Sequence, residues 1–181
     1  FRYHYQIDKN QMIASRIAGG VIWSYGNATT APYTEQFYIG GANSVRAFSA
    51  RSIGPGGYPP ETDRKYTYIN HVGDIRIEAN IEYRFRMIAD LHGAVFLDAG
   101  NVWLMRKDEN RPNGEFTLKN FPKQIALGTG FGLRYDLDFL VFRLDLGIGL
   151  HDPYDTGKSG YYNIPKFKDG MAWHFAIGYP F

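Results

Sequence analysis

The chain has 181 residues, of which 20 are basic and 18 acidic, and its formal net charge of +2 gives no indication of a nucleic-acid partner. Cysteine is absent, which excludes a disulfide scaffold, a cysteine-built zinc site and a thiol nucleophile. No run of 18 or more apolar residues predicts a transmembrane helix. The chain is nevertheless rich in glycine (21), tyrosine (14) and phenylalanine (13), a composition typical of transmembrane β-barrels.

The first residues predict that this chain is part of a longer protein. It begins at Phe1, with no initiating methionine and no signal-peptide pattern. A strand-like stretch, FRYHYQI at 1–7, starts at once, although a domain rarely opens in the middle of a strand. We therefore expect a fragment.

The segment GDIRIEANIEYRFRM at 73–87 alternates without a break between polar and apolar residues. Apolar side chains occupy every odd position from Ile75 to Met87, and polar or charged ones every even position from Asp74 to Arg86. This period of two predicts a β-strand with one apolar and one polar face. The strand exceeds the roughly 9–11 residues that a tilted strand needs to cross a bilayer.

Six other segments repeat the alternation less regularly. Their apolar face often ends in tryptophan or tyrosine, and their other face carries charged residues or glycine. The complete set of predicted strands is 1–7, 11–25, 73–87, 91–103, 124–136, 139–150 and 171–181. Alternation alone fits a soluble β-sandwich, in which the apolar face is the core, as well as a barrel whose apolar face meets lipid.

The predicted connections distinguish these folds, because short and long ones alternate strictly. The short connections are 8–10, 88–90 and 137–138, and the long ones are 26–72, 104–123 and 151–170. Transmembrane barrels combine short periplasmic turns with long external loops, whereas a soluble sandwich has no reason to do so. The pattern favours a barrel in the bacterial outer membrane, with a periplasmic C-terminus and Phe181 at the membrane interface.

Seven is an odd number of strands, whereas single-chain bacterial barrels have an even number and need closure to remove their edges. We therefore predict an all-β fold: the C-terminal seven strands of a larger antiparallel transmembrane β-barrel of about sixteen strands. Residues 1–181 form part of one barrel domain, with a long inserted loop at 26–72.

The long loop contains the sequence FYIGGANSVRAFSARSIGPGGYPP at 37–60. A loop of this length with its own Gly-Gly and Pro-Gly pairs is usually functional or disordered. Arg46 stands between the apolar Val45 and Phe48, which indicates a buried loop tip, so that Arg46 needs an anionic partner. Glu82 and Asp98, on the polar faces of two consecutive strands, are the candidates.

Four motifs, in order along the whole chain, resemble the BamA and TamA assembly factors of the bacterial outer membrane, also called bacterial surface antigens. GGANSVRAF resembles the loop motif of that family, and GDIRIEANIEYRF carries Glu82. VFLDAGNVW resembles its Phe-x-Asp-x-Gly strand motif, and AIGYPF its aromatic-terminated last strand. The matching site residues are Gly40, Gly41, Val45, Arg46, Ala47, Phe48, Glu82, Phe96, Asp98, Gly100, Gly178, Tyr179, Pro180 and Phe181. In its general appearance the sequence is most similar to TamA-like members of the Bacteroidetes.

The resemblance implies that the loop folds back into the lumen, where Arg46 pairs with Glu82 and Asp98. It also implies that the first and last strands of the barrel form a weak lateral seam, at which substrate barrel proteins enter or are templated without ATP. The last strand would then be one side of the seam. Pro180 suits a lightly paired edge, since proline cannot donate to a ladder, and Gly178 permits a kink.

The implied function is assembly and insertion of β-barrel proteins into the outer membrane, by a protein that is not an enzyme and needs no cofactor or metal. The implied partners are outer-membrane lipids, unfolded outer-membrane proteins, and accessory lipoproteins or a periplasmic or inner-membrane partner reached through N-terminal domains outside this chain. Ala47 departs from the family, which has glycine there, and this makes a tight or φ-positive backbone at that position doubtful.

Several other kinds of site are weaker interpretations. A glycosidase-like pair of Glu82 and Asp98 needs one acid of raised pKa, whereas a neighbouring arginine lowers both pKa values. The histidines at 92, 151 and 174 lack metal-ligand spacing, and the acidic segment 152–157 is an ordinary exposed loop rather than a calcium site. The glycines at 128, 130 and 132 lie within a strand, so that clearance for an inserted loop is favoured over a nucleotide loop.

Two other functions stay open at this point. The charged lumen would also suit an outer-membrane channel or a polypeptide-secretion pore of the same superfamily. The third alternative is a soluble, ligand-binding β-sandwich.

Overall fold

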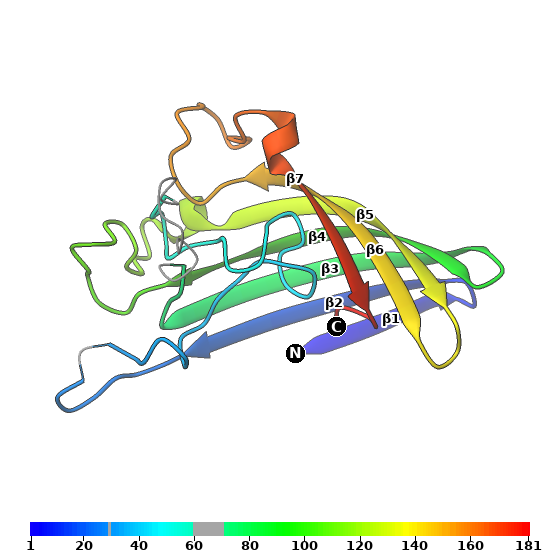
Figure 1. The fold of residues 1–181 in the computed structure, drawn as a ribbon, viewed down its shortest axis with the longest axis horizontal. Helices are drawn as coiled ribbons and strands as arrows, with labels where there is room; N and C mark the ends of the chain where they lie inside the picture. The colour runs from blue at the N-terminus through cyan, green and yellow to red at the C-terminus, as the bar shows by residue number, and fades with distance from the viewer. Residues whose placement is uncertain (29, 60–70) are drawn as a thin grey trace.

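A computed structural model describes residues 1–28, 30–59 and 71–181. Seven strands form one antiparallel sheet in sequence order (Figure 1). They are β1 (Arg2–Asp8), β2 (Gln11–Val21), β3 (Ile75–Ile88), β4 (Leu91–Trp103), β5 (Ala126–Asp136), β6 (Val141–His151) and β7 (Met171–Ile177). The predicted all-β antiparallel fold is confirmed. Residues 29 and 60–70 of the predicted loop at 26–72 lie outside the described residues.

Two short 3-10 helices, η2 (Phe121–Gln124) and η3 (Phe167–Gly170), precede β5 and β7. Among the described residues, no helix is long and apolar enough to cross a membrane.

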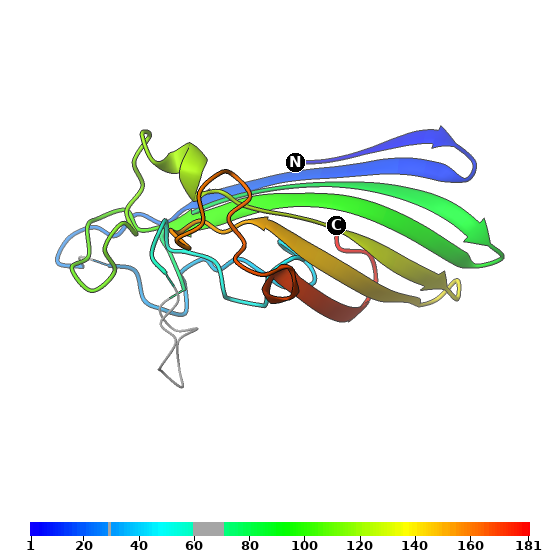
Figure 2. The ribbon, with the colours of Figure 1, turned by 90° about the horizontal axis from the view of Figure 1, so that it is seen from above.

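The loops sort by length to the two ends of the sheet (Figure 1). The tight turns after β1, β3 and β5 lie at one end, and the long connections after β2, β4 and β6 lie at the other. Figure 2 shows that the sheet is curved and that the described part of the first long loop runs along one of its faces. This face is the one that presents the polar residues of the strands, so the loop meets charged side chains.

Burial in this sheet is inverted relative to a soluble protein. Four charged residues of β3 and β4 are buried, namely Glu78, Glu82, Arg84 and Asp98, and Glu82 and Asp98 have no exposed surface. On the opposite face Ile81 is 52% exposed and Trp173 is 64% exposed. An apolar face of this kind needs a nonaqueous environment, which argues against the soluble sandwich and agrees with a sheet whose outer face meets lipid.

The strand register places the polar and glycine residues of the loop-facing side in two neighbouring rows. One row runs across the strands through Arg16, Asn80, Asp98 and Gly128, and the next through Glu82, Phe96, Gly130 and Gly147. Both rows therefore carry polar or bulky side chains on β3 and β4, and only glycine on β5 and β6. A loop lying across them meets hydrogen-bonding partners on one side and open space on the other.

A small apolar cluster fixes the loop at the end of the sheet where the long connections lie. Its buried members are Ile39, Val45, Ile53, Val102 and Ala126, with Phe37 and Phe48 packed against them. Three of the five come from the loop and two from β4 and β5. Burying them therefore attaches the loop to the loop-facing side of the sheet, which we call the wall.

The ends of two predicted strands are wrong. The strand expected at 11–25 ends at Val21, and the strand expected at 171–181 ends at Ile177. Gly178 adopts φ +82°, a left-handed conformation that ends the extended strand. The last residues then turn back towards the middle of the sheet (Figure 1), where Phe181 is 8% exposed. The interpretations of Gly178–Phe181 as strand residues and of Phe181 as a residue at the membrane interface are therefore corrected.

We predict that Ile39→Ala lowers the free energy of unfolding by about 2–5 kcal/mol, because it opens a cavity between the loop and β4. The measurement is urea-induced unfolding of the whole protein in detergent micelles. Leu118→Ala is the matched control, since Leu118 is exposed on another loop, and it should change the free energy little. Equal effects of the two changes would show that the apolar cluster does not hold the loop.

Candidate functional site

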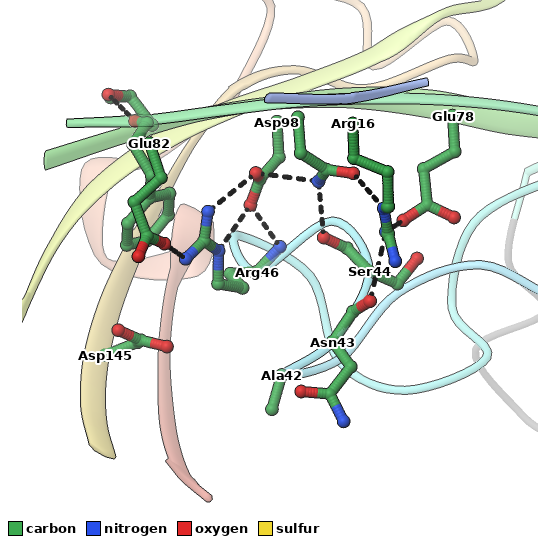
Figure 3. A network of polar contacts seen from close by, with 12 residues as sticks. Arg16, Ala42, Asn43, Ser44, Arg46, Glu78, Glu82, Asp98 and Asp145 are labelled. Carbon is green, nitrogen blue, oxygen red and sulfur yellow. Dashed lines mark hydrogen bonds and ion pairs between the residues drawn. The ribbon is translucent and has the colours of Figure 1, made fainter. Parts of the chain in front are cut away.

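Arg46 of the loop lies between two wall carboxylates and has no exposed surface (Figure 3). Its Nε and Nη2 donate to the two oxygens of Asp98, over 2.8 and 2.9 Å, and its backbone N–H donates to Asp98 over 3.0 Å. Its Nη1 pairs with Glu82. The structure thus brings together the three residues that the sequence singled out, and we call this group the arginine lock.

Further wall groups satisfy the two carboxylates of the arginine lock. Glu82 accepts hydrogen bonds from Arg84 Nε (2.7 Å) and Arg134 Nη2 (3.0 Å), and Asp98 accepts one from Asn80 Nδ2 (2.8 Å). Buried charges are stable only when they are paired and hydrogen-bonded in this manner. Burial opposes the charge of Arg46, but the hydrogen bonds and charges of Asp98 and Glu82 raise its pKa above the ordinary value. Arg46 is therefore a permanent cation.

Other residues of the two family-like motifs shape the surroundings of Arg46. Phe96 places its ring 3.6 Å from the Arg46 guanidinium carbon, a cation–π contact. Gly100 lies under the loop, where a Cβ would come within 2.8 Å of the Ile77 carbonyl oxygen. Gly40 and Gly41 have φ values of +107° and +94°, so that the chain turns sharply just before the tip.

Val45 and Phe48 flank Arg46 as predicted and belong to the apolar cluster described above. Ala47, where glycine was expected from the family resemblance, is buried and has no positive φ. A left-handed backbone is therefore not needed at this position.

Glycines of β5 and β6 provide the seat on which the loop tip rests. A Cβ at Gly128 would overlap the Ala47 side chain, and one at Gly147 would overlap the backbone of Arg46 and Ala47. A Cβ at Gly130 would overlap the Phe96 ring instead. The prediction of clearance for an inserted loop describes Gly128 correctly, whereas Gly147 was not singled out from the sequence.

Sequence reasoning also missed a series of buried charges on the wall. Arg134 forms ion pairs with Glu82 and, over 2.8 Å, with Asp145, which in turn pairs with Arg143 over 3.0 Å. Arg16 pairs with Glu78 on the other side of the lock. Each lies on the polar face of a predicted strand, and this placement was the available signal, but nothing in the sequence separated them from residues exposed to lumen water.

The C-terminal tail, residues 178–181, also reaches the charged wall. Arg84 donates to the Phe181 carbonyl oxygen over 3.3 Å and stacks over the Tyr179 ring at 4.5 Å. The Phe181 ring lies 5.3 Å from the guanidinium carbon of Arg16 and 5.9 Å from that of Arg46. Pro180 is buried in the same tail. The tail and the loop therefore share one group of arginines.

The segment 152–157 is not the uniformly exposed loop that the sequence interpretation expected. Asp152 is buried, its backbone N–H donates to Asn163 Oδ1 over 2.7 Å, and burial raises its pKa. Burial and the neighbouring Asp152 raise the pKa of Tyr154 to about 12. These shifts reflect a folded loop, and in the described ranges no three histidine or acidic side chains gather as a metal site.

Comparison with known proteins shows the family of the chain. The chain matches the Omp85 superfamily domain over residues 1–181 and belongs to that superfamily. It is 27% identical over 177 residues to the outer membrane protein assembly factor BamA of Nitratidesulfovibrio vulgaris, covering 97% of this chain and 20% of that protein. It is 29% identical over 89 residues to BamA of Neisseria meningitidis serogroup B, covering 46% of this chain and 11% of that protein.

The fold is similar to a crystal structure of BamA from Haemophilus ducreyi lacking POTRA domains 1–3. The TM-score is 0.65 at 18% identity, and the match covers 98% of this chain and 34% of that one. The chain thus spans about a fifth of the Nitratidesulfovibrio relative and a third of the solved chain. These likenesses favour neither the channel nor the soluble sandwich.

We predict that Gly147→Ala displaces the loop tip, because the new methyl group would overlap the Arg46 carbonyl; overpacking of this kind costs about 1–3 kcal/mol. The measurement is the rate at which an added protease cleaves the loop in the purified whole protein, which should rise. Gly149→Ala is the matched control on the same strand and face. Its methyl would lie 3.3 Å from the movable end of Ile164, so cleavage should stay near the wild-type rate. Equal cleavage of both variants would contradict the glycine seat.

Proposed function

We propose that this chain forms the C-terminal part of the barrel of an outer-membrane protein assembly factor, which folds and inserts β-barrel proteins into that membrane. The observation that carries the proposal is the arginine lock: a loop arginine buried between two wall carboxylates inside a sheet whose outer face is apolar. Membership of the Omp85 superfamily and the likeness to BamA proteins support it.

In this proposal the action is mechanical and makes no use of catalysis. The locked loop braces the wall from inside, while β7 forms one side of a lateral seam with the first strand of the whole barrel. β7 has 7 residues, against 14 in β3, so it offers a short ladder to a partner strand. A short ladder has few hydrogen bonds to exchange, which suits a seam that opens for an incoming strand.

The orientation follows from the loops. With the long connections outside the cell, β7 runs towards the short-turn end and would end near the periplasmic side, from which the tail after Ile177 turns back towards the middle of the sheet. Lipids of the outer membrane would contact the apolar face, and unfolded outer-membrane proteins would be the substrates. Accessory lipoproteins or periplasmic partners would bind domains outside this chain. Assignment to a TamA-like subfamily of the Bacteroidetes stays a prediction.

We predict that Arg46→Glu in the whole protein impairs assembly, because it leaves three buried acidic groups together where breaking a buried ion pair alone costs about 3–5 kcal/mol. Adding Asp98→Arg should restore function in part, since the opposite charges face each other again with different side-chain lengths. The measurement is the amount of folded barrel proteins in the outer membrane of cells that depend on the variant.

The control for this experiment is Arg51→Glu, the same charge reversal in the same loop. Arg51 donates to the Tyr33 hydroxyl over 2.6 Å, and among the described residues it has no carboxylate partner. This variant should support normal assembly. If Arg46→Glu leaves the amount of outer-membrane proteins unchanged, the loop-locking part of the proposal is wrong.

A further inference from the structure

The loop tip contacts the wall at a second place, just before Arg46. Arg143 of β6 donates from Nη2 to the Ala42 carbonyl oxygen over 2.8 Å and to Asn43 Oδ1 over 2.7 Å. Arg16 of β2 donates to the Asn43 carbonyl oxygen over 3.1 Å, as Figure 3 shows. Two arginines from strands on opposite sides of the lock therefore converge on two consecutive loop residues.

The wall holds both of these arginines in place. Arg16 is oriented by its ion pair with Glu78 and by a 3.0 Å hydrogen bond from its Nε to Asn80. Arg143 is oriented by Asp145 and has almost no exposed surface. Because a guanidinium fixed by a carboxylate loses little further freedom when it binds, these two side chains are ready-made donors for the loop.

The direction of hydrogen bonding is opposite to that of the arginine lock. In the lock, a loop side chain donates to carboxylates of the wall. At Ala42 and Asn43, side chains of the wall donate to the loop, mostly to its backbone carbonyl oxygens. The two attachments thus use separate donors and acceptors, and the second depends on the folded shape of the turn that Gly40 and Gly41 introduce.

We propose that Arg16 and Arg143 are positioning residues that form a second latch on Ala42–Asn43, and that the loop leaves the wall only when this latch and the arginine lock are both open. Two attachments on one short rigid tip reinforce each other, because either one keeps the tip within reach of the other. Loss of Arg46 alone therefore leaves the loop docked for most of the time.

The test follows loop release directly. Val45→Cys places a thiol of similar size at a fully buried position of a chain with no other cysteine. A maleimide reagent labels it only when the tip leaves the wall, and peptide mass spectrometry of the purified whole protein gives the rate at that position. Arg46→Gln is expected to raise the rate about tenfold, since charged hydrogen bonds are lost, and to leave it well below that of the urea-unfolded protein.

The double variant Arg16→Gln with Arg143→Gln should also raise the rate about tenfold, and adding Arg46→Gln should multiply the two effects, because release requires both attachments to open. The replaced arginines leave no carboxylate alone, because Glu78 keeps Arg76 and Asp145 keeps Arg134. If Arg46→Gln alone gives the unfolded rate, or if the double variant leaves the rate unchanged in both backgrounds, the second latch does not exist.

Two further variants test the latch from the exposed loop side, in case the wall variants fail to fold. Asn43→Ala removes one of the two acceptors of Arg143 and should raise labelling about threefold, whereas Asn43→Asp places a negative charge beside Arg143 and should lower it. Arg76→Gln is the control: it removes a charge beside Glu78 without touching the loop and should change nothing. A labelling rate that rises with Asn43→Ala and falls with Asn43→Asp supports the latch. Equal changes in the labelling rate of the two variants overturn it. The readout requires no assembly activity, so its outcome is separate from that of the proposed function.

Discussion

The structure depends on keeping one arginine charged where bulk water does not reach. Arg46 cannot lose its proton, so its burial requires the carboxylates of Asp98 and Glu82 within hydrogen-bonding distance. Glu82 in turn needs Arg84 and Arg134, and because Arg134 also pairs with Asp145, the ion pairs extend over β3, β5 and β6. The polar face of the sheet is therefore one connected electrostatic unit, in which several carboxylates are shared between two or more arginines.

The wall is divided between two kinds of surface, and the loop needs both. β2, β3 and β4 carry most of the partners that hold the tip, and Arg143 of β6 adds another, whereas glycines of β5 and β6 let its backbone approach closely. A side chain at Gly147 would separate Arg46 from its carboxylates even though the charges themselves were intact. Steric clearance on one side of the tip is thus a condition for electrostatic pairing on the other.

Local patterns in the sequence predicted the faces of the strands and the buried position of Arg46, because alternation and flanking apolar residues are properties of neighbours along the chain. The partners Glu82 and Asp98 followed from their place on a polar face, together with the family resemblance. The end of β7 at Ile177 could not be predicted, since the turn at Gly178 accompanies distant contacts between Phe181 and the wall. The contact of Arg143 with Ala42 was equally hidden, because its acceptor is a backbone carbonyl that every residue has.

Attachment of the loop to strands that are not neighbours has a geometric consequence. Backbone ladders join each strand only to the next one, so a sheet can flatten or curl by small rotations between adjacent strands. The tip joins β2 to β6 through Arg16 and Arg143, and it joins both to β3 and β4 through Arg46. The tip therefore links strands that are not adjacent in the curved sheet. With this link in place the curvature of the sheet is fixed, and without it the same strands are free to adopt another curvature.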